Sequence, residues 1–125
     1  MYKSEIIETS IKFENKLDVV AMKDVTDCIA VEDLANSGEE VVIYPGDYAI
    51  LKVENDRSES KEYEVLIVVD REGNKYKTGS ESFRRAFLDI FNELHDEDIV
   101  WGIKIFGKDS KNYKGKKFLT CTACR

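Results

Sequence analysis

A strand, turn, strand and helix pattern in residues 63–94 constrains the fold more than any other feature of the sequence. Tyr63, Val65, Ile67 and Val69 alternate through a β-branched run, which is typical of a strand. The segment 70–74 (DREGN) has turn chemistry, and residues 75–78 return as a second strand. The sequence therefore predicts a β-hairpin here.

An amphipathic helix follows the hairpin. Apolar side chains recur at helical spacing and would bury one face against a sheet: Phe83, Ala86, Phe87, Ile90, Phe91 and Leu94. Either Thr78 or Ser80 can cap the helix, and Thr78 with Glu81 would form a capping box.

The rest of the chain reads mainly as strands and turns. Strands are predicted at 6–13, with a helical start as the alternative, and at 17–22, 40–44, 48–53, 99–106 and 118–124. Residues 28–35 are ambiguous, 45–47 (PGD) predict a turn, 54–60 a loop and 95–98 an acidic turn.

This order predicts a mainly β protein with one helix. Three or more strands, a helix and two strands match a five-stranded barrel of the oligonucleotide/oligosaccharide-binding (OB) type, with the helix between strands three and four. One proline and no Gly/Ser-rich linker favour a single OB-fold-like domain over residues 1–125.

Composition indicates a soluble cytoplasmic protein. No apolar run approaches the roughly 20 residues that cross a bilayer, and residues 1–5 lack a signal-peptide core, so no membrane association is expected. Three cysteines, an odd number, suggest free thiols in a reducing compartment.

Charge is distributed unevenly along the chain. The net charge of −6 argues against binding a polyanion. Residues 1–70 hold 7 basic and 17 acidic side chains, whereas residues 104–125 hold 7 basic side chains and one acidic, Asp109. The basic end is where a nucleic acid would be steered.

The strongest candidate site is the lysine-rich segment that joins the last two predicted strands. Five lysines lie in it, with Tyr113 among them and Phe106 and Phe118 at its ends: Lys108, Lys111, Lys114, Lys116 and Lys117. Mobile cations and flat rings are what single-strand binding requires. The alternative is a solvated hairpin tip whose lysines prevent edge-to-edge pairing.

Strand alternation extends this site. If Trp101, Ile103 and Ile105 face the core, Lys104 and Phe106 share the outer surface. Tyr48 and Lys52 can join them there from another strand, and Lys77 points outward beside an inward Tyr76. Phe106 and Phe118 have a second interpretation, as cross-strand partners that stabilise the hairpin.

The sequence gives little support for a catalytic site or a metal site. Cys121 and Cys124 resemble half a zinc site, but residues three apart on a strand point to opposite faces, and the other ligands would have to come from Cys28, His95 and carboxylates. No phosphate loop, carboxylate pair or nucleophile triad is present, so the sequence predicts no enzyme activity and no cofactor.

Residues 62–94 and 99–124, about half of the chain, resemble single-stranded-DNA-binding proteins of bacteriophages, in particular those of small protein-primed Bacillus phages. The similarity is carried by Asp70, Gly73, Tyr76, Ser80, Asp89, Ile90, Ser110, Lys111, Gly115 and Phe118. It implies an OB fold that coats DNA strands during phage replication in the host bacterial cytoplasm, without catalysis. Tyr76, Lys111, Lys114, Lys116 and Phe118 lie on the matching segments.

The sequence departs from that family in its charge. The N-terminal half is acidic, and the acidic C-terminal tail is absent. The main rival hypothesis is therefore a phage interaction module, such as a DNA mimic that uses residues 1–70 to occupy a host DNA-binding protein. Single-stranded DNA is the expected partner. Binding to replication proteins and assembly into a homo-oligomer are further possibilities that the sequence does not decide.

Overall fold

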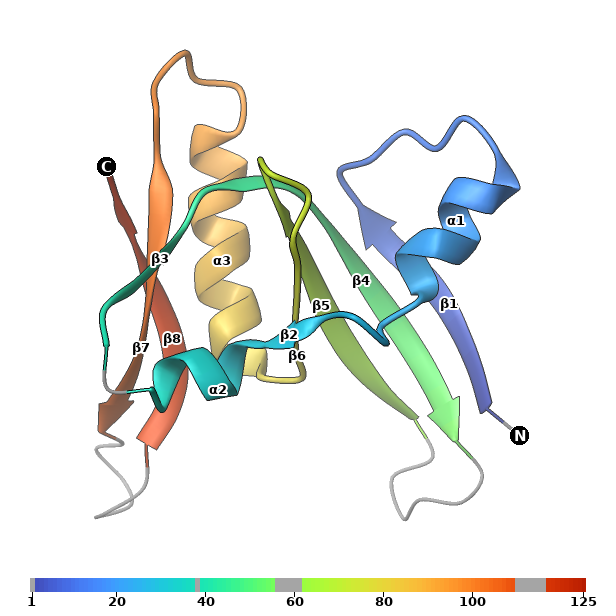
Figure 1. Ribbon diagram of the computed structural model, residues 1–125, viewed down its shortest axis with the longest axis horizontal. Helices are drawn as coiled ribbons and strands as arrows, with labels where there is room; N and C mark the ends of the chain where they lie inside the picture. The colour runs from blue at the N-terminus through green and yellow to red at the C-terminus, as the bar shows by residue number, and fades with distance from the viewer. Residues whose placement is uncertain (1, 38, 56–61, 110–116) are drawn as a thin grey trace. The chain divides into compact units, whose positions relative to one another are not determined.

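The structure, a computed structural model, describes residues 2–37, 39–55, 62–109 and 117–125. These residues form a mainly β protein, as predicted, with eight strands and three helices (Figure 1). In chain order they are β1 (Tyr2–Thr9), α1 (Lys16–Lys23), β2 (Ile29–Ala30), α2 (Val31–Ala35), β3 (Val41–Ile43), β4 (Pro45–Asn55), β5 (Glu62–Asp70), β6 (Lys75–Thr78), α3 (Glu81–Leu94), β7 (Gly102–Asp109) and β8 (Lys117–Cys124).

The strands form two sheets. One has the order β1-β4-β5-β6-β2 and the other the order β3-β7-β8. Over the described ranges neither sheet closes into the expected five-stranded barrel, and the OB fold is not confirmed. The prediction of one helix between strands three and four is also wrong, because α1 and α2 accompany α3, which follows β6. The order of strands along a chain does not specify which edges pair.

The described chain divides into two compact units. The first comprises Met1–Ile29 and Gly46–Gly79, and the second comprises Ala30–Pro45 and Ser80–Arg125. The prediction of a single domain stays a prediction. Within the described ranges, no helix is long and apolar enough to span a membrane.

β4 is central to the first unit. It pairs antiparallel with β1, with an irregularity between Ile6 and Glu8. Leu51 and Val53 of β4 and Ile67 of β5 form a buried cluster, and five apolar side chains pack around it: Ile6, Met22, Val25, Val65 and Val69. The turn predicted at 45–47 is wrong, because β4 begins at Pro45, and proline is tolerated as the first residue of a strand.

A helix replaces the strand that was predicted at 17–22. The side chain of Asn15 accepts a hydrogen bond from the Asp18 backbone amide (3.0 Å) and so caps the N-terminus of α1. The ammonium of Lys75 donates to the carbonyls of Ala21 and Asp24, both at 2.8 Å, at the other end. The apolar side chains of Leu17 and Val20 are 76% and 63% exposed. α1 is thus held by hydrogen bonds at both ends and by the packing of Met22, and none of its side chains is fully buried.

The predicted hairpin of β5 and β6 is confirmed. Asp70 organises its turn, because its carboxylate accepts from the backbone amides of Glu72 (2.9 Å) and Asn74 (2.8 Å) and from the Tyr76 hydroxyl (3.1 Å). Gly73 has a φ of 93°, a conformation that favours glycine.

α3 provides the core of the second unit. Its cap is Ser80, whose hydroxyl accepts from the Phe83 amide at 3.2 Å, while Thr78 belongs to β6. Phe83, Phe87 and Phe91 are buried along one face, as the spacing predicted, and the ring of Phe91 meets Trp101 edge-on at 6.1 Å. α3 lies against β8.

Candidate nucleic-acid interface

The β7–β8 hairpin holds the part of the predicted site that the structure brings together. Lys104 pairs with Thr122, Phe106 with Thr120, and Lys108 with Phe118, so these positions share one face. Trp101, Ile103 and Ile105 are buried, as predicted. The outward prediction for Lys104 and Phe106 is confirmed in that both are partly exposed, and Phe118 is 38% exposed.

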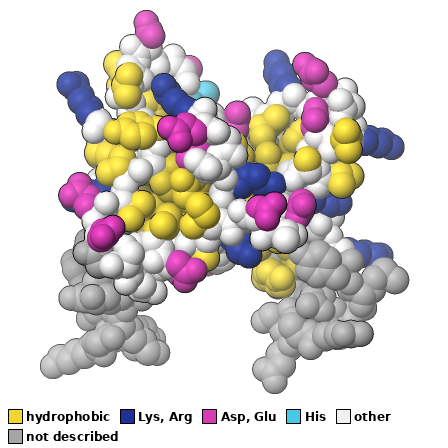
Figure 2. Space-filling model, viewed as in Figure 1, with side chains coloured by type: hydrophobic (Ala, Val, Ile, Leu, Met, Phe, Trp, Pro, Cys, Tyr) yellow, Lys and Arg dark blue, Asp and Glu magenta, His cyan; other side chains and the backbone are white. Residues whose placement is uncertain are grey.

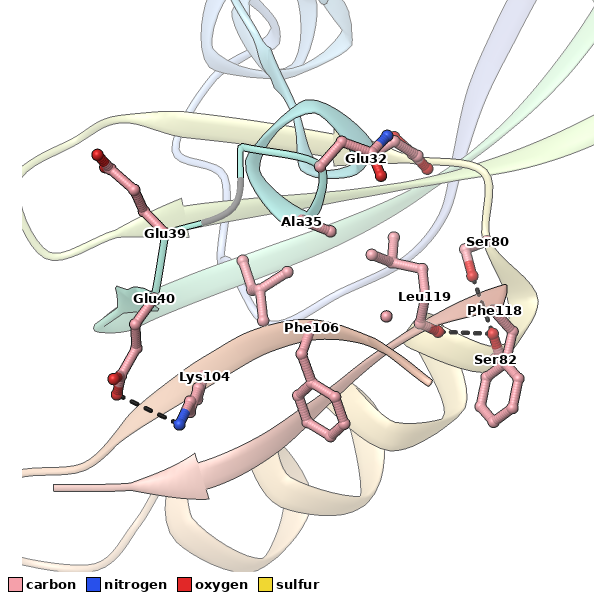
Figure 3. A pocket seen from close by; sticks show the side chains of 13 residues that line it. Glu32, Ala35, Glu39, Glu40, Ser80, Ser82, Lys104, Phe106, Phe118 and Leu119 are labelled. Atoms are coloured by element: carbon pink, nitrogen blue, oxygen red, sulfur yellow. Dashed lines mark hydrogen bonds and ion pairs between the residues drawn. The ribbon is translucent and has the colours of Figure 1, made fainter. Parts of the chain in front are cut away.

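The two phenylalanine rings lie on the same side of this hairpin. Figure 3 shows both rings pointing away from α2, whereas Leu119 points toward it. Phe106 and Phe118 are also diagonal neighbours across the two strands, a spacing within reach of aromatic side chains. Both residues line a pocket of about 680 Å³ in the second unit.

Lys104 is the described lysine nearest these rings in sequence, and it has a carboxylate partner. Its ammonium nitrogen lies 3.4 Å from Glu40 Oε1 (Figure 3). The pair is well exposed to water, so its contribution to stability is small. It nevertheless offsets the charge that a phosphate would meet at this position.

Tyr48 and Lys52 do not join this surface as expected. They lie on β4 of the five-stranded sheet, whereas Lys104, Phe106 and Phe118 lie on the three-stranded sheet. The Tyr48 ring is only 7% exposed, and its hydroxyl donates to Glu8 Oε2 at 2.9 Å. Burial, followed by this hydrogen bond, raises the pKa of Tyr48 to about 12. Tyr48 is thus a structural residue and offers no stacking surface.

Lys52 also has a carboxylate partner. Its ammonium nitrogen lies 3.2 Å from Glu62 Oε1. The hydrogen bond and the charge of Glu62 raise the pKa of Lys52. Acidic side chains also accompany the basic ones elsewhere. On the face shown in Figure 2, acidic and basic side chains are interspersed and the basic ones do not form one patch.

Lys77 and Tyr76 are both half-buried, so burial does not distinguish an outward Lys77 from an inward Tyr76, and these two assignments stay predictions. Lys77 lies opposite Ile67 and Tyr76 opposite Val68, and both partners are buried. β5 is covered on both faces, so strand alternation does not separate a core side from a solvent side. Burial, followed by the hydrogen bond to Asp70, raises the pKa of Tyr76 to about 12.

The remaining predicted site residues have side chains that the structure does not describe. Lys111, Tyr113, Lys114 and Lys116 lie in the segment 110–116, and the side chains of Lys108 and Lys117 are likewise not described, although their backbones belong to β7 and β8. Their grouping with Phe106 and Phe118 rests on the sequence.

Sequence reasoning missed the pocket itself. Its walls come from α2, from residues 39–40 and from the start of α3, and they include Glu32, Glu39, Glu40, Ser80 and Ser82. The Ser82 hydroxyl donates to the Leu119 carbonyl at 2.7 Å, which ties α3 to β8. The adjacent glutamates before β3 were the one available signal, but nothing in the sequence placed them beside β7.

Cys121, Cys124 and His95, which were considered as metal ligands, all lie in the second unit. Cys121 is buried, which raises the pKa of its thiol to about 12, and Cys121 and Cys124 lie on opposite faces of β8. His95 stacks on Phe91, with ring centroids 5.2 Å apart. In the part of the chain that is described, no cluster of three or more metal-ligating side chains occurs.

Comparison with known proteins gives no relative for the chain. No protein-family model matches it, and neither a curated protein nor a solved structure shows significant similarity to it.

Proposed function

We propose that this protein binds single-stranded DNA with little sequence preference, through the outer face of the β7–β8 hairpin and the lysines that join the two strands. The same proposal has three further parts. The protein would coat exposed strands during phage replication, it would be related to the phage single-stranded-DNA-binding proteins, and its fold would have an OB-like origin.

The observation that carries the proposal is the pair of accessible rings on one hairpin face. Phe106 and Phe118 lie on the same side of β7 and β8, and Thr120 and Thr122 flank them. A base stacked on an aromatic ring contributes about 1–3 kcal/mol, whatever its identity, because every base has a flat face. Two neighbouring rings suit two successive unstacked bases.

Charge confines the proposed site to the hairpin. Lys52 and Lys104 already have carboxylate partners, so the phosphate contacts would come from the lysines of residues 108–117, where Asp109 is the sole acidic residue. Tyr48 and Lys52 are withdrawn from the proposed site on these grounds.

The test is a titration of a fluorescein-labelled oligo-dT strand followed by anisotropy. Trp101 is a poor reporter, because its ring is only 4% exposed and packs against Phe91. Phe106→Ala and Phe118→Ala should each weaken binding by about 5- to 150-fold, the equivalent of one lost stack. Tyr63→Ala, which removes a 42% exposed ring from β5, is the matched control and should bind normally. Normal affinity in the double phenylalanine variant would overturn the proposal.

A second candidate function is the acidic interaction module. It is favoured by the carboxylates that pair with Lys52 and Lys104 and by the excess of 17 acidic over 7 basic side chains in residues 1–70. A DNA mimic would give no anisotropy change with oligo-dT and would displace duplex DNA from a DNA-binding protein. The oligo-dT titration therefore separates the two functions.

A further inference from the structure

β1 is an edge strand of the five-stranded sheet. It pairs with β4 on one side, and among the residues that the structure describes no strand pairs with its other side. α1 contacts β1, and in Figure 1 it lies by the C-terminal part of the strand. The regular part of β1, residues 2–6, precedes the irregularity between Ile6 and Glu8. The backbone groups on the open side of this part can pair with a further strand.

Charges on the outer face of this sheet alternate in sign from strand to strand. The Lys52 ammonium of β4 lies 3.2 Å from the Glu62 carboxylate of β5, and Lys52 lies opposite Glu5 of β1 on its other side. Lys3 of β1 lies opposite Glu54 of β4. Lys3 and Glu5 are exposed, and because they are two residues apart on a strand they share one face. The open edge therefore presents one positive and one negative side chain on the same face.

These two charges restrict how a second copy of β1 can pair with the first. Two identical strands pair antiparallel about a two-fold axis, so the residue at the axis lies opposite itself. With Lys3 or Glu5 at the axis, like charges lie directly opposite each other, which is destabilising. With Ser4 at the axis, Lys3 of each copy lies opposite Glu5 of the other. The edge is thus complementary in charge to a second copy of itself in this register.

We propose that two copies of this chain pair through the open edges of β1, antiparallel and with Ser4 at the two-fold axis, which joins two five-stranded sheets into one. Backbone hydrogen bonds supply the affinity, because exposed charge pairs contribute little, and the charges select the register. The interface is small, so the dimer is weak and reversible. The outer face then carries one unbroken row of alternating charges: Glu62, Lys52 and Glu5 of one copy, followed by Lys3 and Glu54 of the second copy.

Sedimentation velocity tests the pairing on the chain with its purification tag at the C-terminus. Between about 1 μM and about 1 mM the wild type should pass reversibly from monomer to dimer. Lys3→Glu and Glu5→Lys each place like charges opposite each other at two points of the interface, so each should weaken dimerisation by about tenfold. Lys12→Glu and Glu14→Lys make the same changes at exposed positions before α1 and should dimerise normally.

An equal mixture of Lys3→Glu and Glu5→Lys shows whether the loss arises between the copies. In a mixed pair every charge at the interface again lies opposite one of the other sign, so the mixture should dimerise with about wild-type affinity. Both variants keep a negative net charge, so general attraction does not explain such a recovery. A change in stability within each chain would persist in the mixture, and recovery would therefore report pairing.

A cysteine at the axis tests the register. In the proposed dimer the two copies of Ser4 lie directly opposite each other, at a Cα separation that a disulfide can bridge. The test is made with the partly exposed Cys28 and Cys124 replaced by serine. Because a disulfide forms only at close approach, Ser4→Cys should cross-link under mild oxidation about tenfold faster than Glu14→Cys or more.

A wild-type chain that stays monomeric over the whole concentration range would overturn the inference. A mixture that dimerises no better than its components would do the same, as would a Ser4→Cys variant that cross-links no faster than its control. The inference goes beyond DNA binding, because β1 belongs to the first unit and Phe106 and Phe118 belong to the second. The oligo-dT titration is a separate measurement, so failure of either proposal leaves the other standing.

Discussion

Asp70 shows how one side chain specifies a local structure. Its carboxylate accepts hydrogen bonds from Glu72, Asn74 and Tyr76, and Gly73 supplies the positive φ that the turn requires. Asp70, Gly73 and Tyr76 are also among the residues on which the expected resemblance to phage DNA-binding proteins rests. The structure gives all three a role in closing the hairpin, so the turn accounts for these residues without a ligand.

Replacing Asp70 by asparagine should destabilise the protein by about 1–3 kcal/mol at pH 7. The two charged oxygens of the carboxylate both accept hydrogen bonds, whereas the amide of asparagine offers one neutral oxygen. Burial raises the pKa of Asp70, but the hydrogen bonds from Asn74, Tyr76 and Glu72 outweigh it and hold the pKa below 3.8. A lowered pKa means that the charged form stabilises the fold above the unfolded pKa and that this contribution is lost as the pH falls through the folded pKa. In urea unfolding, the gap between wild type and Asp70→Asn should therefore narrow below about pH 4. Asp89→Asn, at an exposed helical position, should show neither effect.

The three cysteines should differ in reactivity. Cys121 is 7% exposed and burial raises the pKa of its thiol to about 12, whereas Cys28 and Cys124 are partly exposed. Because the thiolate is the reactive form, Cys121 should react last with a thiol reagent at pH 8. All three should react at similar rates in concentrated urea. Mass spectrometry of the modified peptides assigns each site, and early labelling of Cys121 in the folded protein would contradict the structure.

At the scale of elements, the sequence predicted correctly the strands and the helix whose sequence patterns lie within one short stretch of chain. The alternation in residues 63–69, the turn and the spacing of the three core phenylalanines all lie within one stretch of chain, and each prediction is confirmed. α1 was missed because one of its stabilising contacts is remote: Lys75 lies 51 residues from Asp24, whose carbonyl it binds. Apolar residues at 17–22 suggested burial in a strand, yet Leu17 and Val20 are exposed.

Lys75→Met should loosen α1 with little effect on the rest of the first unit. An eight-residue helix is marginal without tertiary contacts, and this substitution removes two hydrogen bonds from an ammonium to the carbonyls of Ala21 and Asp24. Amide hydrogen exchange in residues 16–25 should quicken by about fivefold or more, equivalent to about 1 kcal/mol. Exchange in β4 and β5 should stay unchanged. Lys77→Met, two residues along the same strand, is the control; equal quickening in both variants would rule out the capping role.

At the scale of the whole molecule, the sequence predicted the class but not the division of strands. Alternation correctly placed Ile103 and Ile105 inward and Phe106 outward. It also grouped Tyr48 and Lys52 with them, because parity gives the face of a strand but not the sheet to which the strand belongs. The two sheets, and the two units, are set by contacts between distant segments such as β1 with β4 and β3 with β7. The sequence did not predict the pocket for the same reason, because its walls come from segments that are far apart along the chain.

The uneven charge of the molecule leads to a prediction about salt. Each lysine–phosphate contact on a single strand adds about 0.7 to the slope of log affinity against log salt, because a counterion is released. Replacing Lys111, Lys114, Lys116 and Lys117 with alanine should therefore lower the slope by about 3 and weaken binding to all sequences alike. Phe118→Ala should reduce affinity with an unchanged slope, since stacking releases no counterions. The matched control removes four lysines elsewhere, Lys3, Lys12, Lys16 and Lys23, and should keep the wild-type slope. If both quadruple variants lose the same slope, the protein attracts DNA through its overall field and the hairpin is not the binding site.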